Sequence, residues 1–330
     1  MSSIYITESG AYLRKRGGRM LVGRNNEILF EVPLEIIEDI TLVDSVHISS
    51  KMITECLERE IPLSWLSSQG SFYGCLINNN SVDVLKHRKQ FMLLEEGTLY
   101  FTLAKKVVFA KCHNQLTILR RYNRNAQSQA VDMAINNIIA VRKNIFSADK
   151  LAPLLGYEGI ISRIYFAALG EIVPEGFRFD GRSKRPPKDP FNSMLSLGYS
   201  MLFNEIMSDL LAIGLHPFVG FMHRPAKGHP ALVSDLIEEW RAPLIDSLVM
   251  SVIKRGMVTL DMFDNTEEGC FLNAMARKQF LQAYNRKLKS ENKYLDTKES
   301  YRESLKRQCR KYASAIANEN PDLYVPLELR

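Results

Sequence analysis

The spacing of apolar residues changes near residue 84 of this 330-residue chain. Before that point, short runs rich in β-branched and aromatic residues alternate with turn signals, a pattern typical of strands and hairpins. After it, runs such as 126–145 and 191–215 carry apolar residues three and four positions apart, which indicates amphipathic or buried helices. The change predicts an α+β protein, with a small β-rich domain over residues 1–83 and a larger helical domain over 84–330. Strands and helices do not alternate, so no parallel sheet is expected.

Turn and cap signals mark the expected elements. Gly17-Gly18 and Asn25-Asn26 predict hairpin turns in the first domain. Ser49 or Ser50 is expected to cap a short helix over residues 51–60. In the second domain, the stretch VPEGFRFDGRSKRPPKDP (173–190) combines prolines, glycines and cations, which predicts a loop between helices. Residues 320–330 are expected to be an extended terminus that binds a partner or nothing at all.

Composition excludes several classes of protein. No apolar run approaches the roughly 20 residues that a membrane-spanning helix needs, and the N-terminus lacks a signal-peptide pattern. We therefore expect a cytoplasmic protein with no membrane partner. The five cysteines include no CxxC pair, which argues against a disulfide framework or a cysteine-rich zinc site. The motifs GxxxxGKS, GxGxxG after a strand, HExxH and GxSxG are absent, so ATP hydrolysis, dinucleotide redox, zincin and α/β-hydrolase chemistry lose their sequence support.

The window FMHRPAKGHPALVSDLIEEWR (221–241) gathers groups that could bind a metal. Asp235 and Glu238 are three residues apart on a predicted helix that Pro243 is expected to end, so the two acids share a helical face. His223 follows an apolar stretch that should hold its backbone, which makes it a better ligand candidate than His229 in a flexible loop. Carboxylate with imidazole suits Mn²⁺, Mg²⁺ or Zn²⁺. The alternative is a solvated acidic face beside surface histidines.

A second candidate is Glu158, which lies on the apolar stripe of the predicted helix over 149–169. It comes four residues after Leu154 and three before Ile161. An isolated buried charge is expensive, so this carboxylate must be neutralised, ion-paired or metal-bound. Arg163 faces another way and is a poor local partner. A buried ion pair with a distant lysine or arginine and ligation of a metal both stay open.

Four segments in order carry a resemblance to a known family: LLGYEG (154–159), RPPKDPFNSMLSLGYSML (185–202), GLHPFVGFMH (214–223) and ALVSDLIEEWRAPLID (231–246). With IPLSWLSSQGSFYG (61–74), they make the chain resemble the CRISPR adaptation integrase, the CRISPR-associated endonuclease that captures new spacers. The resemblance spans nearly the whole chain. It implies a sandwich-like N-terminal domain that mediates homodimer formation and an all-helical catalytic domain.

The resemblance also implies roles for the acids and the histidine. Carried over by motif, Glu158, His223 and Glu238 bind a divalent metal, Mn²⁺ or Mg²⁺, and all contribute to catalysis. Asp235 matches a further acidic position, which we expect to support catalysis without ligating the metal. Some relatives carry aspartate where this chain has Glu238. The implied reaction is attack of a DNA 3′-hydroxyl on phosphodiesters at the ends of a CRISPR repeat, with DNA hydrolysis as a related nuclease activity.

The implied partners are DNA, as spacer precursor and CRISPR repeat, a second copy of the chain, and a small second CRISPR adaptation protein that bridges two dimers in a prokaryotic cell. A net charge of +6 permits an anionic partner. The expected DNA-contacting residues are basic, although lysine and arginine usually lie on solvated helix faces. They are Arg120, Arg121, Arg124, Arg182, Lys184, Arg185, Lys188, Arg286 and Lys287. A nucleic-acid-binding scaffold without catalysis and a metal-dependent RNA nuclease stay open as alternatives, because charge does not separate DNA from RNA.

Overall fold

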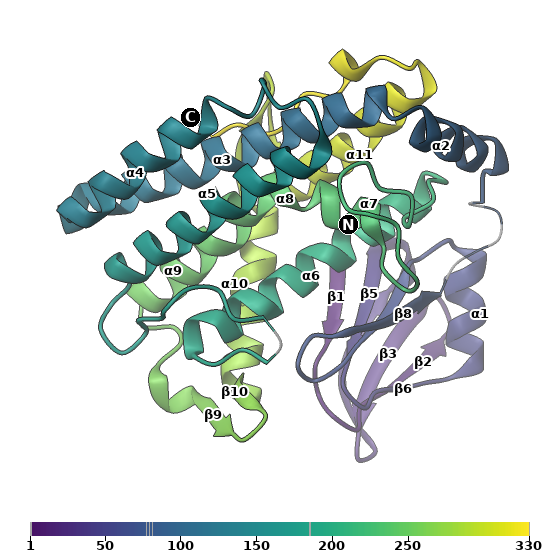
Figure 1. Cartoon of the computed structure of the whole chain (residues 1–330). Coiled ribbons are helices and arrows are strands. Elements are labelled where there is room, and N and C mark those ends of the chain that lie inside the picture. The colour runs from purple at the N-terminus through teal and green to yellow at the C-terminus, as the bar shows by residue number, and fades with distance from the viewer. Residues whose placement is uncertain (1, 77, 79, 81, 185, 330) are drawn as a thin grey trace. The chain divides into compact units, whose positions relative to one another are not determined.

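The computed structural model describes residues 2–76, 78, 80, 82–184 and 186–329. The chain divides into two compact units, Met1–Val82 and Asp83–Arg330, each with its own core (Figure 1). The first unit is rich in strands and the second in helices, which confirms the predicted α+β class. The dimerising and catalytic roles expected for the two units stay predictions. In the parts of the chain described, no helix has both the length and the apolar character that crossing a bilayer demands.

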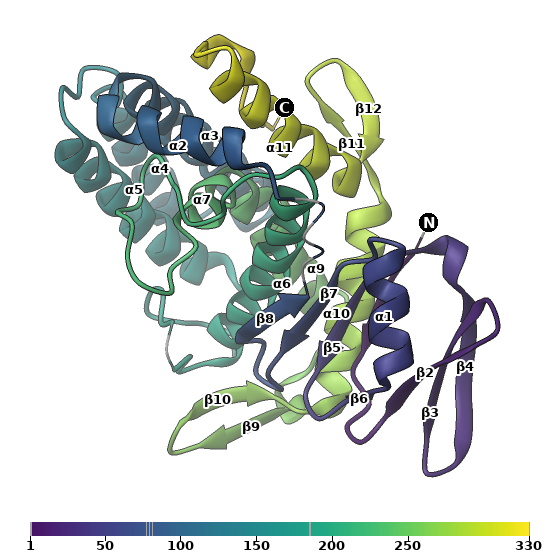
Figure 2. The ribbon, with the colours of Figure 1, turned by 90° about the vertical axis from the view of Figure 1, so that its right-hand side faces the viewer.

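The N-terminal unit contains two four-stranded sheets that share one core (Figure 2). One sheet has the order β1-β5-β7-β8 and the other β4-β3-β2-β6. The pairs β1–β5, β5–β7 and β2–β6 are parallel and the other pairs antiparallel, so both sheets are mixed, and these parallel pairs were not anticipated from the sequence. Strands distant in sequence become parallel neighbours because the chain crosses between the sheets, and α1 supplies one of the crossovers. The elements are β1 Ser2–Ile6, β2 Tyr12–Arg16, β3 Arg19–Arg24, β4 Glu27–Pro33, η1 Leu34–Ile36, β5 Ile37–Val43, β6 His47–Ile48, α1 Ser50–Glu58, β7 Leu63–Leu66 and β8 Phe72–Leu76.

The predicted turn and cap signals of this unit are confirmed. Gly17 has a φ of 58° in the turn that joins antiparallel β2 and β3. Asn25 and Asn26, with φ of 49° and 64°, form the turn between β3 and β4. Both asparagines adopt the left-handed conformation that such a two-residue turn requires. The side chain of Ser49 accepts a hydrogen bond from the backbone N–H of Met52, so Ser49 is the cap of α1.

The second unit is mainly helical. Helices α3, α4 and α5 lie side by side, and the loop 173–189 separates α5 from α6 as predicted (Figure 1). The unit also contains two antiparallel hairpins, β9–β10 and β11–β12, which the expectation of an all-helical domain did not include. The helices are α2 Val84–Glu96, α3 Thr98–Ala126, α4 Gln129–Arg142, α5 Leu151–Ile172, α6 Pro190–Ala212, α7 Ala231–Leu236, α8 Glu238–Trp240, α9 Ser247–Lys254, α10 Ala274–Lys289 and α11 Tyr301–Ala317, with short turns η3 Arg241–Asp246, η4 Leu260–Met262 and η5 Pro321–Leu323. The strands are β9 Phe263–Thr266, β10 Gly269–Leu272, β11 Glu291–Tyr294 and β12 Thr297–Ser300.

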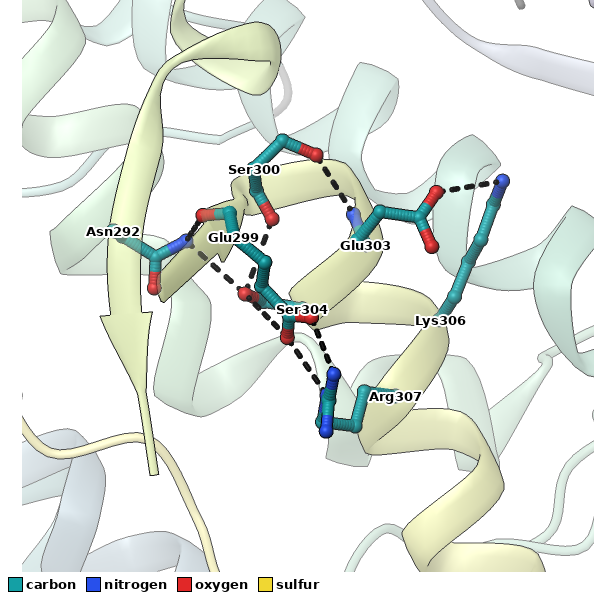
Figure 3. Close-up of polar contacts among 7 residues, drawn as sticks. All are labelled: Asn292, Glu299, Ser300, Glu303, Ser304, Lys306 and Arg307. Carbon is teal, nitrogen blue, oxygen red and sulfur yellow. Dashed lines mark hydrogen bonds and ion pairs between the residues drawn. The ribbon is translucent and has the colours of Figure 1, made fainter. Parts of the chain in front are cut away.

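The hairpin β11–β12 is tied to α11 by polar side chains (Figure 3). Arg307 on α11 donates two hydrogen bonds, of 2.8 and 2.5 Å, to the carboxylate of Glu299 on β12. Asn292 on β11 donates to the hydroxyl of Ser304, also on α11, over 3.1 Å. Ser300 caps the helix by accepting from the backbone N–H at position 303. Side chains of α11 therefore stabilise strands of only four residues each, which are too short to be stable alone.

The expected end of the helix at Pro243 was wrong. After α8 the backbone widens into a π-helical segment, Arg241–Asp246, and then continues directly into α9. In an α-helix, proline removes one hydrogen bond and its ring clashes with the carbonyl four residues earlier. The wider π turn lets the chain pass Pro243 without leaving the helical path, and such turns are frequent at functional sites.

Candidate active site

Two acids from different helices share one lysine. Glu158 on α5 and Glu238 on α8 both contact the ammonium group of Lys111 on α3, which forms an ion pair with Glu158 and lies 2.6 Å from Oε2 of Glu238. Arg241 approaches Glu238 from the other side, with Nη2 at 3.2 Å from Oε1. Lys111 is 8% exposed and Glu238 6%. In this structure a distant lysine therefore neutralises Glu158, and ligation of a metal by the same carboxylate stays open.

The pKa values show that these groups are charged together. Burial alone would raise the pKa of Glu238, but the cations Arg241 and Lys111 outweigh it and lower the pKa to about 2. For Glu158, burial is again opposed by Lys111, and the pKa falls below its usual value. Burial lowers the pKa of Lys111, but the two carboxylates more than reverse this and raise it. At neutral pH the centre therefore holds two carboxylates and two cations.

His223 is held by a buried carboxylate. Asp235 has no exposed surface. Its Oδ1 lies 2.6 Å from Nδ1 of His223 and also accepts the backbone N–H of His223 over 2.9 Å. Oδ2 accepts the backbone N–H groups of Phe221 and Met222 over 2.6 and 2.9 Å. Gly220 makes this approach possible, since a Cβ there would lie 2.5 Å from Oδ2 of Asp235. When the ring of His223 is neutral, its single N–H proton is on Nδ1 and donates to Asp235. The free lone pair of the ring is then on Nε2.

The hydrogen bond to Asp235 raises the pKa of His223, against the opposing effect of burial. The charge of Glu238 raises it further, so His223 lies within electrostatic reach of the acid centre. Burial raises the pKa of Asp235, and its hydrogen bond with His223 acts in the opposite direction. Asp235 thus fixes both the ring and the backbone of His223, and its supporting role in catalysis stays a prediction.

The centre contains oxygen and imidazole donors of the kinds that bind divalent cations. Within the described ranges, no group of three or more histidine, cysteine, aspartate or glutamate side chains is arranged to hold a metal ion. The structure brings Glu158 and Glu238 together through Lys111, and His223 together with Asp235. Two ionised carboxylates and a neutral imidazole nitrogen are nevertheless the donors that Mn²⁺ and Mg²⁺ accept. The residues thus fit such an ion chemically, and its ligation by Glu158, His223 and Glu238 stays a prediction.

Beside the acid centre lies a network that sequence reasoning missed. Asp246, at the end of the π-helical segment, accepts hydrogen bonds from the hydroxyl groups of Tyr165 over 2.7 Å and Tyr199 over 2.5 Å. Burial raises the pKa of Asp246 to about 6, although both tyrosines oppose the rise. The guanidinium of Arg241 lies 4.6 Å from the ring centre of Tyr199, so this network adjoins the pair that Arg241 forms with Glu238. Tyr165 lies on the same apolar stripe as Glu158, and that shared stripe was the available sequence signal.

The basic residues expected to contact DNA fall into different environments. Arg182 points into the protein, where it donates to the side chains of Asn192 and Ser196 over 2.9 Å each. Lys184 is exposed overall, and partial desolvation of its ammonium group together with the charge of Arg241 lowers its pKa. Lys188 is exposed as well. Arg185 lies outside the described residues.

A second basic group lies at the ends of α3 and α10. Arg120, Arg121, Arg124 and Arg286 are exposed, whereas Lys287 is half-buried with its ammonium 4.6 Å from the ring centre of Tyr301. Burial and the nearby charge of Arg121 lower the pKa of Lys287 to about 8. Two cations from different helices are therefore close enough to repel each other, which an anion between them would relieve.

Comparisons with known proteins identify relatives along nearly the whole chain. A model of the family "CRISPR associated protein Cas1" matches residues 4–286. The "CRISPR-associated endonuclease Cas1 3" of Thermus thermophilus is 34% identical, over 99% of this chain and 97% of its own. Among solved structures, a casposase bound to integration product covers 100% of this chain and 95% of its own with a TM-score of 0.88 at 19% identity. A Cas6-RT-Cas1–Cas2 complex matches with a TM-score of 0.85 at 24% identity, over the whole of this chain and 36% of that one. These two structural likenesses concern the fold.

Proposed function

This chain belongs to the family of CRISPR-associated Cas1 proteins, and from that premise we propose that it is a divalent-metal-dependent DNA endonuclease and integrase that joins new spacer DNA into a CRISPR array. The observation that carries the proposal is the pair of ionised carboxylates, half-buried Glu158 and buried Glu238, within electrostatic reach of an imidazole held by Asp235. Two names support it: the Thermus relative is called an endonuclease, and the casposase was solved with an integration product.

In this proposal Glu158, His223 and Glu238 hold Mn²⁺ or Mg²⁺. The bound ion would polarise the scissile phosphate and stabilise the leaving oxygen. Asp235 keeps the ring of His223 in the orientation and tautomer that direct the lone pair of Nε2 toward the ion. Lys111 keeps both carboxylates ionised and close together in the metal-free protein.

The proposed reaction is an exchange of phosphodiester bonds. The oxygen of a DNA 3′-hydroxyl gives up its proton to solvent and forms a new bond to phosphorus at the end of a repeat. The bond from phosphorus to the leaving 3′ oxygen breaks, and that oxygen takes a proton from solvent. Hydrolysis follows the same course with water as the attacking group. One bond is made as another is broken, so no energy-supplying nucleotide is required, which agrees with the absence of a GxxxxGKS loop.

DNA binding in this proposal uses the exposed basic residues. Arg121 and Lys287 are the strongest candidates in the group at the ends of α3 and α10, since a phosphate between them would offset their mutual repulsion. Each phosphate contact releases counterions, so log affinity falls as log salt rises. Replacing Lys287 by glutamine should make this slope shallower by about one. Lys184 and Lys188 in the loop before α6 are proposed to contact DNA nearer the acids.

The proposed assembly contains more than one chain. Two copies would pair through the N-terminal unit, and a small second adaptation protein would bridge two such dimers. The name of the Cas6-RT-Cas1–Cas2 complex supports a partner of this kind. Light scattering of the chain alone and with the second protein measures both steps.

The test compares three glutamine variants in assays of cleavage and strand joining with Mn²⁺. Glu158→Gln and Glu238→Gln keep the size of the side chain but remove its charge, so we expect both activities to fall to background while the protein stays folded. Glu171→Gln is the matched control, because Glu171 is exposed on the same helix as Glu158. Matched RNA substrates run alongside decide between the two nucleic acids. A folded Glu158→Gln protein that cuts and joins at the original rate would falsify the proposed centre.

A further inference from the structure

The C-terminal residues 321–329, here called the tail, are bound to the helical unit through their backbone. Lys106 on α3 donates to the carbonyl groups of Pro321 over 2.7 Å and Tyr324 over 3.4 Å. Tyr294 on β11 donates to the carbonyl of Val325 over 3.1 Å. Tyr324 and Leu327 are almost fully buried. The sequence had left open whether this terminus binds anything, and the structure shows it packed against its own chain.

Asn114 joins the tail to the turn that carries the candidate ligand Glu238. Its side-chain amide donates 2.8 Å hydrogen bonds to the carbonyl of Leu327 in the tail and to the carbonyl of Glu239 in α8. Its amide oxygen accepts the backbone N–H of Leu329 over 2.8 Å. One buried side chain on α3 therefore fixes the tail and α8 at the same time.

The carboxylate of Glu239 makes the second connection. This side chain has no exposed surface, and its Oε1 accepts the hydroxyl of Tyr324 over 2.6 Å and the side-chain amide of Gln308. Its Oε2 accepts the backbone N–H of Leu327 over 2.5 Å. The tail supplies two of these three donors, so removing it would leave a buried carboxylate largely unsatisfied.

The turn held in this way has little helical support of its own. Helix α8 comprises only Glu238–Trp240, and the π-helical segment follows it immediately. Successive residues of a helix point about 100° apart. Glu238 can therefore contact Lys111 and Arg241 while its neighbour Glu239 contacts the tail. Contacts made by Glu239 set the rotation of the turn, and through it the direction of Glu238.

We propose that the tail is a positioning element for the metal site: by binding Glu239 it fixes the turn α8 and so directs the carboxylate of Glu238. The inference rests on the proposed function, in which Glu238 is a ligand. The family model ends at residue 286, so the tail lies outside the region by which the family is recognised.

The test uses the metal-free protein and Mn²⁺ as the probe. Tyr324→Phe removes the hydroxyl that donates to Glu239 and keeps the ring, and a chain ending at Val325 removes the N–H of Leu327. The control is His113→Gln, because Nε2 of His113 contacts the tail at the carbonyl of Leu329 over 2.7 Å without touching Glu239. Amide hydrogen exchange over residues 238–241 reports on the turn, and the signal of free Mn²⁺ in electron paramagnetic resonance gives its Kd.

We expect Tyr324→Phe to speed exchange at the turn and to raise the Kd for Mn²⁺ about tenfold, with affinity for DNA in EDTA unchanged. His113→Gln should leave both quantities within about twofold. Unchanged exchange and an unchanged Kd in both tail variants would overturn the inference, as would an equal effect of His113→Gln. If the wild-type chain binds no Mn²⁺, the proposed function fails, and exchange at the turn still decides whether the tail holds α8.

Discussion

Glu239 offers the sharpest test of the buried electrostatics, because it differs from its neighbour Glu238 in one respect. Cations surround Glu238, whereas the donors to Glu239 within the described part of the chain are neutral. Burial therefore dominates and raises the pKa of Glu239 from 4.5 to about 8, although hydrogen bonds from Tyr324 and Leu327 oppose the rise. The folded chain holds this proton more tightly than the unfolded chain does.

The sign of the effect on stability follows from that difference. A carboxyl group with a raised pKa contributes its full stabilisation below about pH 4.5 and loses it as the pH rises through about 8. At about 1.4 kcal/mol per pH unit, the whole loss amounts to roughly 4–5 kcal/mol. Glu239→Gln keeps the shape and an oxygen acceptor but cannot ionise, so it removes this dependence.

The assay is urea unfolding at a series of pH values, followed by the fluorescence of Trp240. Trp240 is buried next to Glu239, and a Trp65→Phe background silences the only other tryptophan. The free energy of unfolding of Glu239→Gln minus that of its parent cancels all groups that the two proteins share. We expect this difference to rise by roughly 3 kcal/mol between about pH 5.5 and 8. A difference that stays level over this range would refute the argument from burial.

Three further predictions concern single contacts. Lys111→Met leaves two carboxylates facing each other, so it should destabilise the metal-free protein by roughly 3–5 kcal/mol. Added Mn²⁺ should then raise the Tm of the variant more than that of the wild type, and equal rises in the two proteins would contradict this. Tyr199→Phe removes a 2.5 Å hydrogen bond that lowers the pKa of Asp246, so an infrared titration of that carboxyl should place its pKa above about 6, and an unchanged titration would count against the contact. Arg307→Lys loses the bidentate contact with Glu299, so amide hydrogen exchange over residues 291–300 should become faster. Because the Arg307 side chain is 37% exposed, we expect the free energy of unfolding to fall by about 1 kcal/mol at most, and a much larger loss would contradict this.

The first unit was predictable because its signals are local. Hairpin turns at Gly17-Gly18 and Asn25-Asn26 and the cap at Ser49 each depend on the conformation of a few adjacent residues. Parallel pairing of β1 with β5 depends instead on a crossover of some thirty residues, for which the sequence carries no local mark. Topology is set by which buried faces meet, and a single sequence does not show which faces meet.

The hairpins and the π turn of the second unit escaped prediction for a related reason. Strands β11 and β12 are four residues each and are stabilised by Arg307 and Ser304, which lie on a different element. Pro243 normally predicts the end of a helix, and only the surrounding contacts make a wider turn the better solution. Where tertiary contacts decide the local backbone, rules of sequence spacing reach the wrong boundary.

At the candidate site, the sequence identified which acid needed a partner but not the partner itself. The apolar stripe around Glu158 showed that its charge had to be compensated. Lys111 lies 47 positions earlier on another helix, and nothing in the sequence around it distinguishes it from a lysine on a solvent-exposed face. The family resemblance implied only that Asp235 supports catalysis, without saying what it contacts. The structure shows four hydrogen bonds to its carboxylate, two of them from His223.

The charge of the centre leads to a final prediction about metal and DNA together. The paired groups are Glu158, Glu238, Lys111 and Arg241, two anions and two cations whose formal charges cancel. A divalent cation added alone leaves a buried excess of two positive charges, which is unfavourable, and a DNA phosphate next to it offsets part of that excess. Mn²⁺ and DNA should therefore bind cooperatively, each strengthening the other by the same factor, roughly 5- to 150-fold for an ordinary coupling. Titrating Mn²⁺ with and without a short DNA duplex measures this factor. Lys111→Met should reduce it, because its centre begins with one more negative charge; equal Mn²⁺ affinities with and without DNA would show that the four charges do not act as one unit.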